Sequence, residues 1–215
     1  MTFSELRHKS RRESDYIISI LLANEISLLI TWGLLETKIT PNQVTIASVI
    51  SGLLSGICLA FGLFLPGALF LFLFHVLDCT DGNLARAKEM FSDYGRWLDF
   101  VGNRMAEMCV FLGASLYFFR IGESNIWIIL PILGSLLLLL YYYIVDVALS
   151  LGISETKQSI TSFELKGVHV KFGLYEPVLY GFIILAPLGF LKIQIILISA
   201  LIILTLGYQL YKKMK

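Results

Sequence analysis

Charged residues are scarce in this chain. Only 15% of its 215 residues are charged, whereas 57% are hydrophobic, and the mean hydropathy is +0.78. A soluble domain usually has about a quarter of its residues charged, so most of this protein's surface is expected to face lipid rather than water. The net charge of only +1 gives no indication of a nucleic-acid partner.

Cysteine is rarer still, with three residues at Cys58, Cys79 and Cys109. This odd number without metal-like spacing implies no disulfide framework. Cys58 and Cys109 lie in apolar runs and are expected to be small core residues. A signal peptide is not expected, because no small-residue cleavage site follows the basic cluster at residues 7–12. We expect that cluster, together with His8, to contact lipid headgroups.

Long apolar runs are what the chain has instead. Six of them are long enough to cross about 30 Å of hydrocarbon at about 1.5 Å per helical residue. They span residues 44–64, 67–88, 96–119, 126–149, 173–190 and 192–211. Because backbone groups must stay hydrogen-bonded in lipid, each run is expected to be a helix. The fold class is therefore predicted to be all-α, with a six-helix transmembrane bundle.

Basic residues predict the orientation of this bundle. If both termini are cytoplasmic, all of the 17 Lys and Arg residues except Arg120 and Lys192 fall on the cytoplasmic side. The stretch 17–35 is interrupted by Asn24 and Glu25, and a seventh span would reverse the charge bias. We therefore expect an amphipathic helix in the cytoplasmic interface there.

Three regions follow from this arrangement. Residues 1–43 are the cytoplasmic N-terminus with the interfacial helix, residues 44–211 are the transmembrane domain, and residues 212–215 are a basic cytoplasmic tail. The polar stretch 150–172 is expected to be a cytoplasmic loop.

Gly52 and Gly56 lie four residues apart in the first span. Such a pair of small residues lets two helices approach closely. It is explained by close packing inside the bundle, and a homodimer contact is the alternative.

Carboxylates occur at a depth where lipid makes them costly. Asp78 lies about 12 residues after Pro66, or roughly 18 Å of helix rise, which is past the bilayer midplane. Ionisable groups at that depth require partners or a wet cavity. Asp78 and Asp81 share one helix face, and Asp99 and Asn103 share a face of the returning helix. Both pairs can therefore converge.

Three carboxylates and an amide oxygen would form a hard, oxygen-only site that suits Mg²⁺ or Mn²⁺. Gly82 leaves room for a ligand beside the acids, and Arg86 offers a fork for a phosphate. This combination indicates phosphoryl transfer. One alternative is a structural cluster of ion pairs, Asp81 with Arg86 or Asp99 with Arg104. Another is a divalent-cation transporter with midplane carboxylates.

The spacing of these residues resembles the signature of the CDP-alcohol phosphotransferases, a family of integral membrane enzymes. The matching residues are Asp78, Asp81, Gly82, Ala85, Arg86, Gly95 and Asp99. Every gap in the signature is kept, and only the last position differs, where the family's usual Asp is replaced by Asn103. The segment Thr40-Pro41-Asn42-Gln-Val-Thr45 also resembles the start of the family's first span.

The resemblance implies transfer of a substituted phosphoryl group, often phosphatidyl, from a CDP-alcohol to an acceptor hydroxyl, with release of CMP. It assigns Asp78, Asp81, Asp99 and the position of Asn103 to Mg²⁺ or Mn²⁺. The CDP-binding positions that it implies are Asn42, Thr45, Asp78, Gly82, Ala85, Arg86 and Gly95. The site is expected to face the cytoplasm from a multi-pass protein of the cell membrane.

Asn103 stands where the resemblance implies a metal ligand and the base that acts on the acceptor hydroxyl. An amide cannot take that proton near neutral pH. The residue is an engineered change, or the chain is a natural relative with another base, or it is a catalytically silent relative. Glu107, one turn further along, is the obvious substitute base, but Arg104 and Glu107 could instead neutralise each other.

Candidates for binding a phosphorylated acceptor lie before the fifth span. They are Lys157, Lys166, His169 and Lys171, and the positive-inside bias explains the lysines equally well. His75 shares a face with Asp78 and is expected to be a hydrogen-bonded packing residue. The segment containing Arg12, Asp15 and Ser19 resembles relatives that use inositol-phosphate acceptors. A polyol or polyol phosphate is thus the expected acceptor class.

Overall fold

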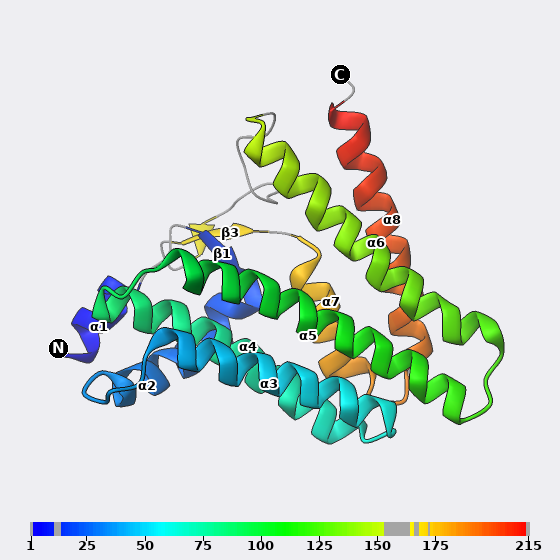
Figure 1. Cartoon of the computed structure of the whole chain (residues 1–215), viewed down its shortest axis with the longest axis horizontal. Helices are drawn as coiled ribbons and strands as arrows, with labels where there is room; N and C mark the ends of the chain where they lie inside the picture. Colours follow the sequence, from blue (N-terminus) through cyan, green and yellow to red (C-terminus); the bar gives the residue numbers. More distant parts are fainter. Residues whose placement is uncertain (1, 11–13, 153–163, 166–167, 172, 214–215) are drawn as a thin grey trace.

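The computed structural model describes residues 2–10, 14–152, 164–165, 168–171 and 173–213, and these residues are mostly helical (Figure 1). The helices are α1 (Phe3–Lys9), the π-helical turn η1 (Ser19–Ala23), α2 (Asn24–Leu34), α3 (Pro41–Ala60), α4 (Phe64–Lys88), α5 (Asp93–Arg120), α6 (Asn125–Ser150), α7 (Tyr175–Leu185) and α8 (Leu191–Lys213). The strands are β1 (Ser14–Tyr16), β2 (Glu164–Leu165) and β3 (Val168–Lys171).

Local sequence defines the starts of α3 and α5. The Thr40 hydroxyl accepts a hydrogen bond from the Gln43 backbone N–H, and the Gln43 side chain accepts one from the Thr40 N–H. This capping box, with Pro41 as the first helical residue, starts α3 three residues before the predicted span. Ser92 caps α5 by accepting a hydrogen bond from the Gly95 N–H.

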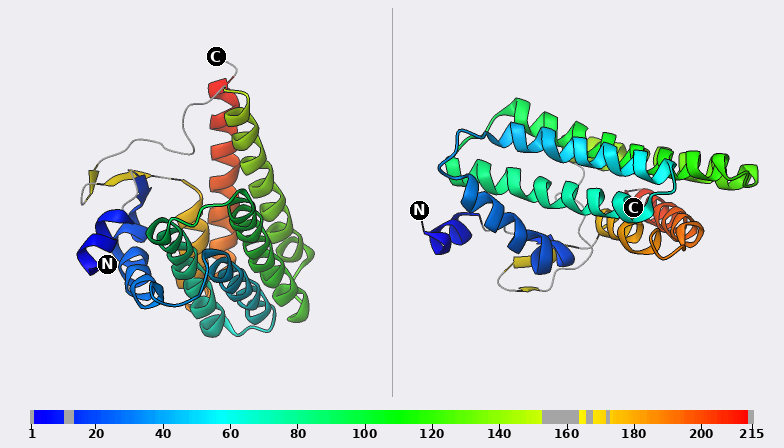
Figure 2. Two further views of the ribbon diagram at one scale, coloured as in Figure 1. Left: turned by 60° about the vertical axis from the view of Figure 1, so that its left-hand side comes forward. Right: turned by 90° about the horizontal axis from the view of Figure 1, so that it is seen from below.

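Helices α3, α4 and α5 lie side by side and run back and forth (Figures 1 and 2). Glycine makes the α3–α5 contact possible, because a Cβ added to Gly113 would overlap the Gly56 carbonyl oxygen, and a Cβ added to Gly56 would overlap Cys109. Gly52 faces Ala106 in the same way. The small-residue pair of the first span is therefore used in packing within the chain. A homodimer contact stays a prediction, and these glycines do not support it.

The remaining helices complete the core beside this layer. α6 packs against α5 and α8, and α7 packs against α4 and α8. In Figure 1, α6 and α8 extend away from the other helices toward the C-terminus. The largest buried side chains of the shared core are Tyr141, Phe74, Phe111, Phe118 and Phe182.

Four of the described helices are long and apolar enough to cross a membrane: α3, α4, α6 and α8. α5 has sufficient length, but Asn103, Arg104 and Glu107 lower its mean hydropathy. α7 has only 11 residues, about 16 Å of helix, which is half of the hydrocarbon thickness. The six-span count and the cytoplasmic location of both termini therefore stay predictions.

The predicted all-α class is incomplete, because the structure also contains a small sheet with the strand order β1-β3-β2. β1 pairs in parallel with β3, with Ser14 opposite His169, and β2 pairs antiparallel with β3. β2 and β3 lie within the stretch 150–172 that was expected to be a loop, which was wrong for these residues. Strands of two to four residues are too short for an alternating pattern to reveal them.

The N-terminal segment packs beside the end of α4. It forms η1 and α2 in the stretch where an interfacial helix was predicted, and its depth in the membrane stays a prediction. Arg7 pairs with Glu25, and Lys9 pairs with Glu89, each at 2.6 Å. The hydrogen bond from the Lys9 ammonium lowers the pKa of the Glu89 carboxyl below its ordinary value. These exposed pairs connect α1 to α2 and to the residue that ends α4.

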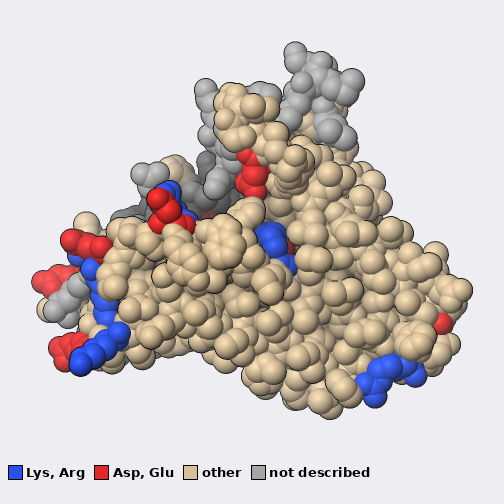
Figure 3. All heavy atoms as spheres, viewed as in Figure 1, with Lys and Arg blue, Asp and Glu red and all other residues tan. Residues whose placement is uncertain are grey.

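Residues other than Lys, Arg, Asp and Glu cover most of the face shown in Figure 3, and charged side chains are sparse over its middle. Large hydrophobic residues on several helices are more than half exposed, such as Leu65 and Ile126, and Leu204 reaches 70%. A water-soluble monomer rarely exposes contiguous apolar surface of this extent. The surface therefore agrees with a multi-pass membrane protein.

Candidate active site

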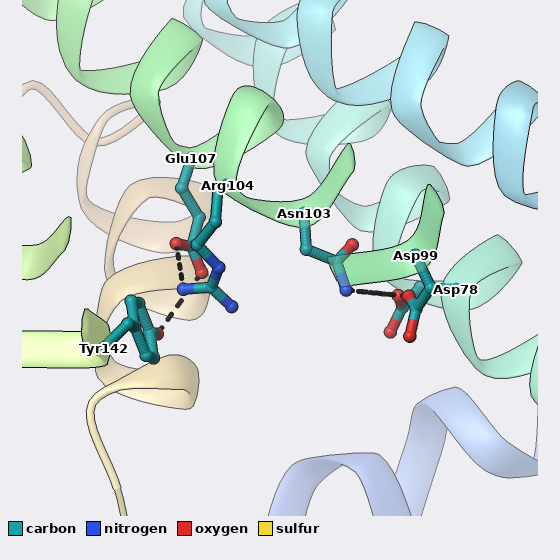
Figure 4. A network of polar contacts seen from close by, with 6 residues as sticks. All are labelled: Asp78, Asp99, Asn103, Arg104, Glu107 and Tyr142. Carbon is teal, nitrogen blue, oxygen red and sulfur yellow. Dashed lines mark hydrogen bonds and ion pairs between the residues drawn. The ribbon is translucent and has the colours of Figure 1, made fainter. Parts of the chain in front are cut away.

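Asn103 joins two of the predicted acids. Its Nδ2 atom donates hydrogen bonds to Asp78 Oδ1 at 2.9 Å and to Asp99 Oδ1 at 3.0 Å (Figure 4). Asp78 is on α4, whereas Asp99 and Asn103 are one turn apart on α5. The structure thus brings together residues from two helices, as the spacing predicted. Because both amide hydrogens face carboxylates, the Asn103 carbonyl oxygen is directed away from these hydrogen bonds.

Asp81 is held by α3. The Thr45 hydroxyl donates a hydrogen bond to Asp81 Oδ2 at 2.6 Å and also lies 3.1 Å from the Pro41 carbonyl oxygen. Thr45 and Asp81 are both buried. A hydrogen bond to an ionised carboxylate is stronger than one between neutral groups. Thr45, predicted only to face the ligand pocket, therefore has a defined role in orienting Asp81.

Asn42 and Gly95 are neighbours across the start of α3 and the start of α5. A Cβ added to Gly95 would lie 2.7 Å from Asn42 Oδ1. Only glycine therefore leaves the Asn42 side chain in this position without a shift. Two predicted CDP-binding residues are brought together in this way.

Arg86 is oriented by residues that the sequence did not single out. Its Nη2 atom donates a hydrogen bond to Asn83 Oδ1 at 2.6 Å, and Asn83 Nδ2 donates to Ser27 Oγ at 2.8 Å. Asn83 and Ser27 are buried. This chain of hydrogen bonds connects the signature arginine on α4 to α2, one element of the predicted interfacial segment. Gly82 and Ala85 are half-buried on the same helix.

Arg104 and Glu107 form a separate cluster, which points toward Tyr142 rather than toward Asp99 (Figure 4). Arg104 Nη1 lies 2.7 Å from Glu107 Oε2, and the guanidinium carbon lies 3.5 Å from the centre of the Tyr142 ring. The Tyr142 hydroxyl is 3.4 Å from Glu107 Oε1. The expected alternative, in which Arg104 and Glu107 neutralise each other, is what the structure shows. The other alternative, a pairing of Asp99 with Arg104, is not what the structure shows for these two residues.

The donor set of the acidic cluster fits a hard divalent cation. Asp78, Asp81 and Asp99 offer carboxylate oxygens, which Mg²⁺ and Mn²⁺ prefer, and none of the three is paired with Arg104. Asn103, the fourth member of the cluster, presents its N–H donor to two of these carboxylates instead of its oxygen. Its oxygen reaches a cation only after the amide rotates by about 180°, since the nitrogen cannot ligate.

One known protein family matches most of the chain. The sequence profile of the CDP-alcohol phosphatidyltransferase family matches residues 38–210, which include every element of the acidic cluster. The chain belongs to this family. Its other members give the context for the acidic cluster described above.

Sequence relatives in the family cover only part of the chain. A phosphatidylinositol phosphate synthase of Cutibacterium acnes is 34% identical over 96 residues, which are 44% of this chain and 46% of the relative. A bifunctional IPC transferase and DIPP synthase of Aquifex aeolicus is 29% identical over 57% of this chain and 28% of the relative. The matched stretch thus spans less than half the length of either relative.

Solved structures share the fold over most of the chain. The Mycobacterium tuberculosis phosphatidylinositol phosphate synthase PgsA1, in complex with manganese and citrate, has a TM-score of 0.68 at 19% identity and covers 88% of this chain and 89% of its own. The same enzyme with CDP-DAG bound also has a TM-score of 0.68, at 20% identity, covering 88% of this chain and 94% of its own. These likenesses confirm the fold.

The structure describes only some of the residues that were predicted to bind an acceptor phosphate. His169 is exposed on β3, where it pairs with Ser14 and Glu164. Lys171 ends β3, and its side chain lies outside the described residues. Lys157 and Lys166 also lie outside them. Their role as acceptor contacts stays a prediction.

His75 is buried and hydrogen-bonded through both ring nitrogens. Nε2 lies 3.1 Å from Ser19 Oγ, and Nδ1 lies 2.9 Å from the Tyr175 hydroxyl. The expectation that His75 is hydrogen-bonded is thus confirmed. Ser19 also donates its backbone N–H to Glu176 Oε1 at 2.9 Å, so α4, η1 and α7 meet at this histidine.

Sequence reasoning missed several polar residues that hold the site, among them Asn83, Tyr142 and Tyr175. Asn83 is at an unspecified position inside the signature, and the two tyrosines are far from the signature in sequence. Asn83 carried a usable signal, since it is a polar residue in a helix predicted to cross lipid. Tyr142 and Tyr175 carried none, because tyrosine is frequent throughout this chain.

Proposed function

We propose that this chain is a membrane phosphotransferase that moves a substituted phosphoryl group, in particular phosphatidyl, from a CDP-alcohol to the hydroxyl of a polyol or polyol phosphate, and releases CMP. The observation that carries the proposal is the convergence of Asp78, Asp99 and Asn103 from two helices, with Asp81 oriented by Thr45. Membership of the CDP-alcohol phosphatidyltransferase family supports it.

Asp78, Asp81 and Asp99 would hold Mg²⁺ or Mn²⁺. A divalent cation there supplies charge neutralisation for the diphosphate of the donor. Manganese in the related PgsA1 structure supports this choice of ion. Asn103 would add an uncharged oxygen ligand after its amide has rotated, so it weakens cation binding relative to an aspartate at the same position.

The donor would lie against α3, α4 and the start of α5. Asn42 and Gly95 are adjacent there, and Gly82 leaves room beside the acids. Arg86 would orient the phosphates with its guanidinium, which Asn83 holds through one nitrogen. Ala85 and Thr45 would line the same face. CDP-DAG in a PgsA1 structure supports a CDP-lipid as the donor class.

Proton removal from the acceptor hydroxyl is the step for which this chain is poorly equipped. Asn103 cannot accept a proton near neutral pH, and the Glu107 carboxylate is already engaged by Arg104 and Tyr142. Asp99, bonded to Asn103, is the nearest remaining base on α5. We therefore propose slow turnover rather than a silent protein, because the donor-binding residues of the signature are all present.

A phosphorylated polyol is the acceptor class that we favour. The sequence relatives are named as a phosphatidylinositol phosphate synthase and as bifunctional IPC transferase and DIPP synthases. His169 on β3, with Lys166 and Lys171, would bind the acceptor phosphate at the membrane surface. The site would face the cytoplasm, as the distribution of basic residues predicts.

The substitution Asn103→Asp tests this proposal. We expect it to raise the rate of CMP release from CDP-diacylglycerol by a factor on the order of 10² to 10⁴, the usual contribution of a positioned general base. The assay measures CMP formed with Mg²⁺ or Mn²⁺ present and a panel of polyol phosphates as acceptors. Equal rates for the parent and Asn103→Asp proteins would contradict the role given to this position.

Asp81→Asn is the matched control for the acidic cluster. It keeps the shape of the side chain, removes one metal-binding charge, and should abolish turnover in the Asn103→Asp background. If neither protein binds a cytidine nucleotide but both bind divalent cations in vesicles, the cation-transporter alternative is favoured instead.

A further inference from the structure

We infer that His75, Asp78 and Cys79 form a second metal site, one that takes a borderline or soft cation such as Zn²⁺ and shares Asp78 with the oxygen-only cluster. Each of the three residues offers one ligand atom, and these atoms all lie within 4.8 Å of one another. His75 and Cys79 are buried, and Asp78 is half-buried. The site is thus a compact group with one imidazole, one carboxylate and one thiol.

Helix geometry assembles this group on α4. Asp78 and Cys79 follow His75 by three and four residues, so all three side chains project from one face of the helix. Tetrahedral zinc takes nitrogen and oxygen ligands at about 2.0–2.2 Å and sulfur at about 2.3 Å. Side-chain rotations on a fixed backbone therefore suffice to draw ligand atoms that are already within 4.8 Å onto one ion.

The surroundings of His75 suit a metal ligand. A histidine bound to a metal usually donates its other ring N–H to an oxygen partner, which fixes the ring. Here Nε2 faces Ser19 Oγ and Nδ1 faces the Tyr175 hydroxyl, so either nitrogen can bind the ion while the other keeps its partner. Tyr175 or a water would supply the fourth ligand.

The chemistry of the ligands selects the cation. Thiolate and imidazole favour zinc over magnesium, and affinity for such sites rises from Mn²⁺ toward Zn²⁺. The oxygen-only cluster favours the harder ions. Cys109 offers a contrast within the same chain, because its Sγ donates a hydrogen bond to the Leu53 carbonyl oxygen and it belongs to no such group among the described residues.

Occupation of this site has a consequence for the oxygen-only cluster. Asp78 accepts a hydrogen bond from Asn103 and is one of the three carboxylates assigned to Mg²⁺ or Mn²⁺. Zinc on His75, Asp78 and Cys79 competes with the cation of the cluster for that carboxylate. Zinc is therefore an inhibitor of phosphotransfer; this consequence rests on the proposed function, whereas the binding itself does not.

Cobalt absorption tests the binding without any substrate. Co²⁺ added to the purified protein should bind at about one ion per chain with tetrahedral d–d bands and a thiolate-to-cobalt charge-transfer band in the near ultraviolet, and Zn²⁺ should displace it. The charge-transfer band should be lost in Cys79→Ser and kept in Cys109→Ser, the matched control. No band in the parent, or a band that survives Cys79→Ser, overturns the inference.

Two further measurements separate this site from the proposed activity. Asp81→Asn should keep the cobalt band while turnover is lost, which shows that the protein is folded and that the two sites differ. If CMP is released, Cys79→Ser should keep its Mg²⁺-supported rate and need on the order of tenfold or more Zn²⁺ for equal inhibition. If no CMP is released by any variant, the proposed function fails and the cobalt band still decides the metal site.

Discussion

Asn103 supplies two N–H donors between two carboxylates, where an aspartate would supply a third negative charge. Asp78 and Asp99 each accept one of these donors, so the pair is stabilised without a cation. Three facing carboxylates would repel one another unless a cation or a proton neutralised them. The identity of this one residue therefore sets how strongly the folded protein depends on metal.

Chelation should reveal this dependence. In Asn103→Asp, EDTA should lower the melting temperature in detergent by several degrees, because loss of the cation leaves a carboxylate, in place of the amide donor, facing Asp78 and Asp99; about 1 kcal/mol shifts the melting temperature of a domain of this size by roughly 2–4 °C. The parent protein should change much less. Excess Mg²⁺ should restore the variant.

The exchange variant Asp99→Asn with Asn103→Asp is the control for this experiment. It keeps one carboxylate and one amide on the same two turns of α5, facing Asp78 of α4. A response to EDTA as large as that of Asn103→Asp alone would mean that position, rather than charge, determines the metal dependence.

Helix packing fixes the distance between the acids. α3 and α5 approach so closely that a Cβ on Gly113 would overlap the Gly56 carbonyl oxygen. α3 also contacts both helices that carry the acids, because Thr45 donates a hydrogen bond to Asp81 of α4 and Asn42 lies beside Gly95 of α5. The glycine contact is remote from the acids, yet it determines how α3 lies against α5, the helix that carries Asp99 and Asn103.

A methyl group at Gly113 should therefore disturb both stability and activity. Gly113→Ala must move α5 away from α3, at a cost of about 1–3 kcal/mol for overpacking, and CMP release by the Asn103→Asp protein should fall with it. Gly207→Ala on α8 is the matched control, since nothing lies within 4 Å of its added Cβ. That control should be neutral or stabilising by up to about 1 kcal/mol; equal melting temperatures for the two alanine variants would refute this account of the contact.

Helical periodicity explains why the acidic cluster was predictable. The pairs Asp78–Asp81 and Asp99–Asn103 are each spaced to lie on one helix face, so the two faces can converge when α4 and α5, which both pack against α3, run antiparallel. The orientation of the Asn103 amide was not predictable, because it depends on which partners are present. The Tyr142 contact to Arg104 also depends on the crossing of α5 and α6, and no local pattern encodes that crossing.

At the scale of the whole molecule, the charged residues predict the orientation in the membrane. Glu123, at the α5–α6 turn, pairs with Lys192 at the start of α8 at 2.6 Å. The opposite end of the molecule carries the ion pairs Arg7–Glu25 and Lys9–Glu89. The second end has more basic residues in its neighbourhood, and we place it in the cytoplasm.

Labelling of introduced cysteines tests this orientation. In intact cells, a membrane-impermeant maleimide should react with Ser124→Cys, whereas Thr37→Cys should react only after the cells are permeabilised. The parent protein is the control, because Cys58, Cys79 and Cys109 lie within helices and should not be labelled. The reverse labelling pattern would invert the topology.

The pairing of β1 with β3 constrains the order in which parts of the chain reach their final positions. Ser14 lies opposite His169, so the N-terminal strand cannot pair with β3 until α3, α4, α5 and α6 have all been synthesised. At about 5–20 residues per second, the first residues wait for roughly ten seconds or longer. The N-terminal segment is therefore the first part of the chain to leave the ribosome and among the last to reach its final position.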